Sequence, residues 1–186
     1  LDDSEKNSKY PILIEGNMTI KDNSVIGPFP GQGNVQVKAG TLELMSGEII
    51  GTGDPAYQTN YSCGVYVTNK ASVNMSGGVI RNHASNFGAG MQVWNESTVT
   101  LTGGEIKNNV GGLGGGIYVN ESKLIMNATQ KDADGCHITD NISEVIGQGG
   151  NGSGGGICLE KNSNAFINVG CIQNNKALMG GGINVY

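Results

Sequence analysis

The sequence predicts an all-β protein, a single-stranded right-handed parallel β-helix of about six coils. A glycine-punctuated unit recurs along the chain, apolar residues alternate with polar ones, and a helical period is nowhere convincing. Self-similarity at a period of about 20 to 50 residues is typical of solenoids, whose units bury their apolar faces only against neighbouring units. The units begin at Gly64, Gly90, Gly116, Gly156 and Gly182, so the intervals are 26, 26, 40 and 26 residues.

Each unit contains three short predicted strands. Such strands are too short to pair within one unit, so we expect each to pair with the equivalent strand of the next unit. Three strands in a coil favour a triangular, right-handed helix. Glycine pairs at 77–78 and 103–104, and glycine triplets further along, supply the positive φ angles that turns between strands need. In the unit that starts at Gly90, the alternating apolar residues are Met91, Val93, Val99, Leu101 and Ile106.

Earlier coils and insertions complete the predicted architecture. Residues 35–49 repeat the apolar spacing of the later units, and residues 12–20 form a degenerate first coil. Residues 51–62 lengthen one coil, and the 40-residue interval absorbs 127–135 and 143–153. Insertions of this kind are expected as surface loops, where solenoids most often place function, although tolerated decoration is an equally simple interpretation.

The whole chain, 1–186, is expected to be a single β-helix domain. No change in composition marks a linker, and the sequence stops in the first strand of a new coil without a closing cap, which suggests a fragment of a larger surface protein with neighbouring domains. The net charge is -5 and the Lys and Arg residues form no basic run, so no nucleic-acid binding is expected. No stretch approaches the roughly 20 apolar residues that span a bilayer, so no membrane insertion is expected.

A polar pair follows the third strand of several units. Asparagine side chains stacked in successive coils can form a hydrogen-bonded ladder that satisfies the turn backbone and their own amides. We therefore predict a structural role for these pairs. They are Asn82–His83, Asn108–Asn109, Asp140–Asn141 and Asn174–Asn175.

An outward column of aromatic and amide residues is the candidate ligand-binding site. Tyr66, Gln92 and Tyr118 occupy the same slot of successive units, and Trp94 lies just beyond it. A sugar ring stacks on exposed aromatic side chains because its C–H face is apolar, while its hydroxyls need polar partners. The column therefore predicts glycan binding, unless these tyrosines simply pack on their neighbours in a β surface.

The acidic run Asp132-Ala133-Asp134-Gly135, with Asp140 downstream, has the alternating carboxylates and turn glycine of a calcium loop. An ordinary Asp-Gly turn explains the same residues. We expect no other cofactor.

The four cysteines lack the spacing of a zinc site. Cys136 and Cys171 fall on adjacent coils, one residue out of register, where a disulfide is possible.

A different column carries the candidate catalytic carboxylates. Glu48 and Glu105 lie two coils apart, near 10 Å, with Val79 between them, and His137 and Cys171 continue the column. This separation is at the upper edge for a pair of inverting carboxylates, and we expect no Arg or Lys column beside it. A solvated strand face is the simpler interpretation.

The segments Gly77-Gly78-Val79-Ile80-Arg81-Asn82 and Gly103-Gly104-Glu105-Ile106-Lys107-Asn108, each followed by a glycine-rich corner, resemble the repeats of chlamydial polymorphic outer membrane proteins and related bacterial surface β-helix regions. The resemblance covers about 35–186. It implies a right-handed parallel β-helix in an extracellular or cell-surface bacterial protein used for adhesion or as a stalk, with a glycan or a host or cell-surface protein as partner. The predicted function is a non-catalytic extracellular module for adhesion or glycan binding. The alternative is a carbohydrate-active β-helix enzyme, lyase or glycoside hydrolase-like, or its accessory domain.

Overall fold

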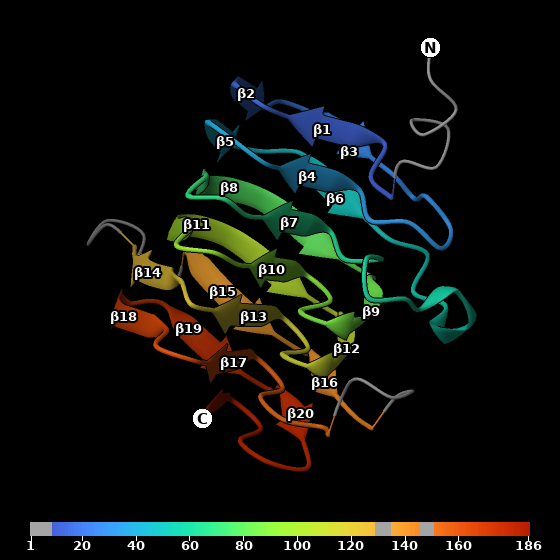
Figure 1. Ribbon diagram of the computed structural model, residues 1–186, viewed down its shortest axis with the longest axis vertical. Coiled ribbons are helices and arrows are strands. Elements are labelled where there is room, and N and C mark those ends of the chain that lie inside the picture. The colour runs from blue at the N-terminus through green and yellow to red at the C-terminus, as the bar shows by residue number, and fades with distance from the viewer. Residues whose placement is uncertain (1–8, 129–134, 146–150) are drawn as a thin grey trace.

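The protein is all-β. The computed structural model describes residues 9–128, 135–145 and 151–186, and within these ranges it contains strands, turns and one short 3₁₀ helix, η2 (Pro55–Tyr57), but no α-helix. All strand pairs are parallel and lie in three sheets, and within each sheet the strands stack along the molecule, from β1 and β2 at the N-terminal end to β20 at the other (Figure 1). Parallel strands in stacked sheets are compatible with the predicted parallel β-helix.

The first sheet joins the strands that follow the repeated glycine corners. Its register pairs Met91 with both Val65 and Ile117, so each strand hydrogen-bonds to its equivalents in the neighbouring repeats, as predicted. The sheet has seven strands, in the order β1 (Ile12–Ile14), β4 (Val35–Val37), β7 (Val65–Val67), β10 (Met91–Val93), β13 (Ile117–Asn120), β17 (Ile157–Glu160) and β21 (Ile183–Val185).

The second sheet contains the other two strands predicted in each repeat. In two repeats these strands are continuous, because β8 (Ser72–Arg81) and β11 (Thr98–Lys107) run through their glycine pairs. The glycine pairs therefore form bulges with register shifts, and the prediction that they separate two strands is wrong for these repeats. The other strands are β2 (Asn17–Ile20), β3 (Val25–Ile26), β5 (Thr41–Leu44), β6 (Glu48–Ile50), β14 (Lys123–Asn127), β15 (Cys136–Thr139), β18 (Asn164–Val169) and β19 (Cys171–Gln173).

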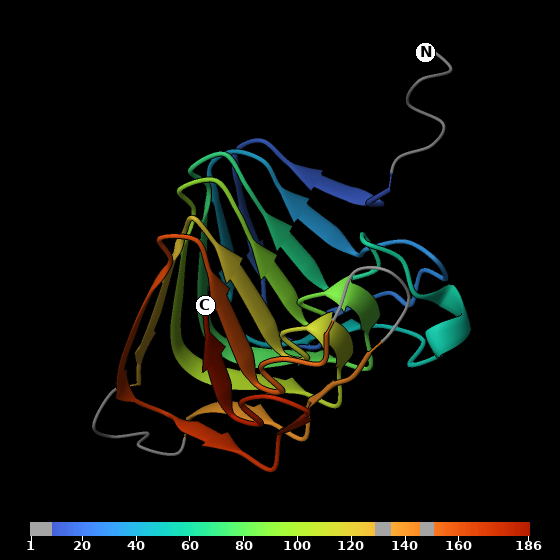
Figure 2. The same cartoon turned by 60° about the horizontal axis from the view of Figure 1, so that its bottom comes forward.

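The third sheet is made of short strands that follow the polar pairs. Its order is β20 (Lys176–Ala177), β16 (Ile142–Ser143), β12 (Val110–Leu113) and β9 (Ala84–Phe87). The three sheets surround one interior, which Figure 2 shows with the C-terminal end turned forward. Aliphatic columns fill this interior, because alternate residues of each parallel strand point to the same face at every level. One such column contains Val35, Val65, Met91, Ile117 and Ile157, all fully buried.

A buried asparagine ladder forms the corner between the second and third sheets. The Nδ2 of Asn109 donates to the Oδ1 of Asn141 at 3.0 Å, and the Nδ2 of Asn141 donates to the Oδ1 of Asn175 at 3.0 Å. Each of these amides also donates to a backbone carbonyl, for example from Asn141 to Ile106 at 2.9 Å. The predicted structural role of the polar pairs is confirmed.

The first residue of each pair makes the turn itself. Asn82, Asn108, Asp140 and Asn174 have φ angles of 59°, 54°, 56° and 56°, in the left-handed region that asparagine and aspartate tolerate better than most residues. The second residue can then point its side chain into the corner. His83 takes the ladder position in the earliest of these corners, where its backbone N–H donates to the Oδ1 of Asn109 at 3.0 Å.

Candidate functional site

The predicted ligand column exists in the structure, but part of it is covered. Tyr66 and Tyr118 are the direct register partners of Gln92 on either side, which confirms that the three residues share one column. The expectation that they are all exposed is wrong, since Gln92 and Tyr118 are each only 2% exposed. Phe87 and Leu113, at the ends of β9 and β12, pack over the C-terminal part of the column.

Where the column is not covered, it borders an open groove of about 240 Å³. The groove combines residues from β7, β9 and β10 with a loop from the 51–62 insertion. Three of the four predicted ligand-binding residues, Tyr66, Gln92 and Trp94, line it, whereas Tyr118 lies behind it. The full lining, which we call the aromatic groove, is Asn60, Tyr61, Tyr66, Phe87, Gln92 and Trp94.

The rings of the aromatic groove are held by other rings. Tyr66 stacks on Tyr10, with ring centroids 5.5 Å apart and planes 12° from parallel. Phe87 and Trp94 meet edge to face at 6.4 Å, and the Tyr118 ring lies 5.2 Å from Trp94 behind them. Aromatic pairs in these geometries contribute about 0.5–1.5 kcal/mol beyond their buried area, so the groove presents preformed aromatic surfaces.

Gln92 fixes the floor of the groove. Its Nε2 donates to the backbone oxygens of Asn60 at 3.0 Å and Phe87 at 2.9 Å, which ties the inserted loop to the end of β9. Its Oε1 accepts a hydrogen bond from the Nε1 of Trp94 at 3.4 Å and so orients the indole. The amide therefore positions both the loop and the largest ring of the groove.

The lining of the groove carries no charged side chain. At its edge the Nζ of Lys9 lies 3.5 Å from the centroid of the Tyr61 ring, a cation–π contact that covers one face of that ring. Aromatic faces beside neutral amides suit a ligand with an apolar face and several hydroxyl groups.

Three residues of the groove were not identified from the sequence. Asn60 and Tyr61 come from the 51–62 insertion, which marked a loop but not the side chains that turn back to the column. The sequence does mark Phe87 as part of the repeat, because this residue directly precedes a glycine corner, and so does its register partner Leu113 one repeat later.

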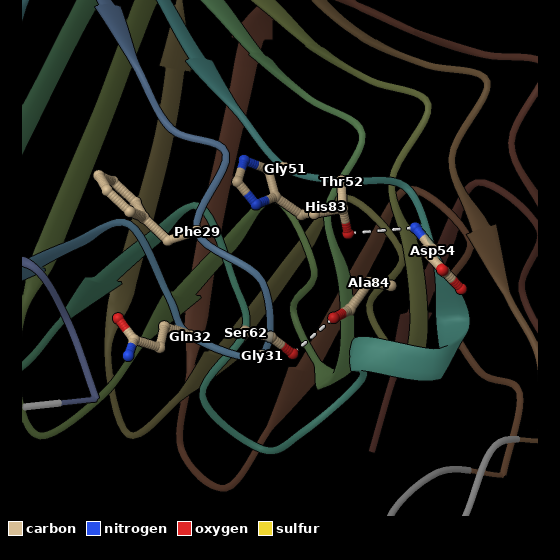
Figure 3. Close-up of a pocket in the computed structure, with 9 residues that line it drawn as sticks. All are labelled: Phe29, Gly31, Gln32, Gly51, Thr52, Asp54, Ser62, His83 and Ala84. Carbon is tan, nitrogen blue, oxygen red and sulfur yellow. Dashed lines mark hydrogen bonds between the residues drawn. The ribbon is translucent and has the colours of Figure 1, made fainter. Parts of the chain in front are cut away.

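A second, much smaller cavity lies next to the same insertion (Figure 3). Its volume is about 10 Å³, which is about the space of one water molecule. Ser62 donates to the backbone oxygen of Ala84 at 2.6 Å beside it. His83 lines the cavity, and burial lowers the pKa of its imidazole to about 4. A volume of this size excludes an organic ligand. The lining residues are those drawn in Figure 3, Phe29, Gly31, Gln32, Gly51, Thr52, Asp54, Ser62, His83 and Ala84.

The calcium site predicted from Asp132, Asp134 and Asp140 stays a prediction. Asp132 and Asp134 lie outside the described residues, and Asp140 is an exposed corner residue with φ of 56°. Among the described residues, no group of three or more His, Cys, Asp and Glu side chains could hold a metal ion.

The predicted disulfide between Cys136 and Cys171 is not formed, and both residues are free thiols. Cys171 pairs in register with His137, so Cys136 is one residue out of step. Successive residues of a strand point to opposite faces, which turns Cys136 into the core and Cys171 away from it.

The candidate catalytic carboxylates occupy one column, as expected, with Val79 between Glu48 and Glu105. Each carboxylate has a basic partner. Arg81, on the neighbouring strand β8, lies 2.8 Å from Glu48, and Lys107, on the same strand as Glu105, forms an ion pair with it. The expectation of no flanking Arg or Lys is therefore wrong, because Arg81 and Lys107 are register partners in the adjacent column.

Comparison with protein-family models, curated proteins and solved structures finds no match to this chain. Within the described residues, no helix has the length and apolar character needed to cross a membrane.

Proposed function

We propose that this chain is a right-handed parallel β-helix of about six coils, and that it functions as a non-catalytic module that binds a carbohydrate in the aromatic groove. One observation carries the proposal: the groove brings Tyr61, Tyr66 and Trp94 together with amide side chains around one open hollow. Periodic strands alone would give a spacer. The inserted loop beside the column converts one part of that surface into a concave, aromatic site.

The ligand chemistry follows from the lining. The apolar C–H face of a pyranose ring packs on Trp94 or Tyr66, and its hydroxyl groups meet the exposed amide of Asn60, while Gln92 holds the loop and the indole in place from below. A volume of about 240 Å³ is below the usual range of small-molecule pockets, so the groove fits one or two sugar rings and not a buried oligosaccharide. The neutral lining favours an uncharged sugar.

The biological setting belongs to the same proposal. The resemblance of the repeats to bacterial surface β-helix regions supports an extracellular or cell-surface location. There the groove serves adhesion by holding a glycan, free or carried on a host or cell-surface protein, while neighbouring domains of a longer chain provide the anchor.

Binding to an immobilised set of neutral and acidic glycans, followed by titration calorimetry with the best ligand, tests the function. We expect Trp94→Ala to weaken binding at least about tenfold, because the largest stacking surface is lost. Phe166→Ala is the matched control, since Phe166 is an exposed aromatic side chain on the second sheet, away from the groove. Equal binding by both variants and the unmodified chain, or retention of no glycan, would contradict the proposal.

A carbohydrate-active enzyme is the second candidate, favoured by the row of Glu48 and Glu105 with their basic partners. The same glycans, assayed for newly released reducing or unsaturated ends, separate the two functions. If the chain turns over a glycan, and Glu105→Gln abolishes this turnover while Trp94→Ala leaves it unchanged, then the function is catalysis and not binding.

A further inference from the structure

The polar atoms of the aromatic groove differ in whether they are free to bind a ligand. The side chain of Gln92 is fully used inside the protein, because its Nε2 donates to the backbone oxygens of Asn60 and Phe87 and to the Oγ of Ser85 at 3.2 Å. Its Oε1 accepts from the Nε1 of Trp94, which is the only polar atom of that side chain. Neither Gln92 nor Trp94 therefore offers a free side-chain donor to a ligand.

Asn60 is different, because its side chain is exposed and only half used. Its Oδ1 accepts a hydrogen bond from the Nδ2 of Asn86 at 2.6 Å, which orients the amide. Among the described residues, the Nδ2 of Asn60 has no hydrogen-bond partner. An amide nitrogen carries two N–H donors and does not accept. The free amide atom that Asn60 presents to the groove is therefore a donor, and it requires an acceptor on the ligand.

The donor of Asn60 lies in the same part of the groove as the indole of Trp94. Both residues hydrogen-bond to the side-chain amide of Gln92, one through its backbone oxygen and the other through its indole nitrogen. Phe87 lies edge to face with the same indole, so the surface beside the donor is aromatic. A ligand that fills this part of the groove needs a hydrogen-bond acceptor and an apolar group next to each other.

We propose that the aromatic groove selects sugars that carry an N-acetyl group, and that Asn60 is the specificity-determining residue. This inference rests on the proposed carbohydrate-binding function. The Nδ2 of Asn60 donates to the carbonyl oxygen of the acetamido group, and the acetyl methyl group packs on the ring of Trp94. A hydroxyl group at the same place of the sugar supplies an acceptor but no apolar surface. The acetamido group is also uncharged, which matches a lining without charged side chains.

The experiment compares two sugars that differ in one substituent. Methyl N-acetylglucosaminide and methyl glucoside of the same anomer are titrated into the full chain at pH 7 and followed by calorimetry. We expect the N-acetylated sugar to bind at least about fivefold more tightly, because burial of one methyl group and one more hydrogen bond are gained. Saturation-transfer NMR should show the strongest signal at the acetyl methyl protons.

Asn60→Asp tests the assigned residue. The substitution keeps the oxygen that accepts from Asn86 but replaces the two donors by a second acceptor, so the preference for the N-acetylated sugar should be lost. Asn162→Asp is the matched control, because Asn162 is an exposed residue in the turn between β17 and β18 and gains the same charge. This variant should leave the ratio of the two affinities unchanged. Circular dichroism checks that both variants fold.

The outcomes separate this inference from the function on which it rests. Equal affinities for the two sugars would overturn the N-acetyl preference and leave carbohydrate binding in place. A preference that Asn60→Asp does not alter would overturn the role of Asn60. Binding of neither these sugars nor any immobilised glycan would overturn the proposed function together with the inference. The comparison of the two sugars uses the unmodified chain, so it is decisive even if Asn60→Asp does not fold.

Discussion

The asparagine ladder and the aromatic groove are two stacks of equivalent positions in the same repeats, with opposite relations to solvent. Asn109 and Asn141 are fully buried, and each hydrogen-bonds to the next member of the ladder and to the backbone. In the groove, Tyr66 and Trp94 remain partly exposed beside an open hollow. A position that repeats in every coil therefore has a structural role where each side-chain amide hydrogen-bonds to the next one, as in the ladder. Where the 51–62 insertion borders the column, the rings of Tyr66 and Trp94 stay partly exposed and form a candidate binding surface.

The largest effect is expected in the ladder. Asn141→Ala removes the side-chain acceptor of the Asn109 backbone N–H and the side-chain donor to the backbone oxygen of Ile106. At roughly 1–3 kcal/mol for each buried unsatisfied group, the free energy of unfolding should fall by about 3–5 kcal/mol, measured by urea denaturation. Asn108→Gly, at an exposed neighbour with positive φ, is the control and should cost less than about 1 kcal/mol. Equal losses in both variants would remove the distinction between ladder and turn residues.

His83 occupies the ladder position in the earliest of these corners, so the pH dependence of stability tests the same part of the structure. Its pKa is about 4 in the folded protein and about 6.5 in an unfolded chain, so the unfolded state binds more protons between these values. Stability should therefore be fully present above about pH 6.5 and decrease as the pH falls to 4, by roughly 3 kcal/mol at about 1.4 kcal/mol per unit. His83→Asn restores the ladder residue, and the difference in unfolding free energy between variant and unmodified chain should shrink as the pH rises. A difference that is constant from pH 4 to pH 7 would contradict a buried, neutral imidazole.

Gly155 and Gly181 occupy equivalent positions in two successive glycine corners. A Cβ on Gly155 would lie 2.3 Å from the backbone oxygen of Gly181, whereas a Cβ on Gly181 would meet its nearest atom, the oxygen of Asn175, at 3.1 Å. We expect Gly155→Ala to lower the unfolding free energy by about 2 kcal/mol and Gly181→Ala by less than about 1 kcal/mol, because only the first forces backbone to move. Thermal unfolding followed by circular dichroism measures both. If Gly181→Ala lowers the unfolding free energy more than Gly155→Ala does, then contact with the backbone of the following repeat is not the reason that glycine is needed at this position.

The smallest effect on stability is expected in the groove. Tyr61 is an exposed loop residue, so Tyr61→Ala should change the unfolding free energy by less than about 0.5 kcal/mol. The same substitution should reduce glycan affinity several-fold, because it removes one wall of the hollow. Calorimetric binding and urea denaturation on one preparation give both numbers. A stability loss without an affinity loss would assign Tyr61 to folding and weaken the contrast between the two stacks.

Much of the fold was predictable because a repeated spacing determines which residues face each other. Met91 pairs with Val65 and Ile117, and Tyr66 with Gln92, as the glycine spacing indicates. The ladder was predictable for the same reason, since asparagine recurs at the same offset after each third strand. The continuity of β8 and β11 through their glycine pairs was not, because a glycine at positive φ is compatible with a turn and with a bulge.

The sequence by itself determined the parallel pairing, the buried aliphatic columns and the column that contains Tyr66, Gln92 and Tyr118. Only the tertiary structure decided that Tyr118 is covered, that Asn60 and Tyr61 return to the column, and that Arg81 and Lys107 neutralise the two glutamates. The physical reason is that hydrogen-bonded pairing of equivalent strands fixes positions one period apart. The path of an aperiodic insertion and the choice of an ion-pair partner depend instead on packing between residues that no period relates.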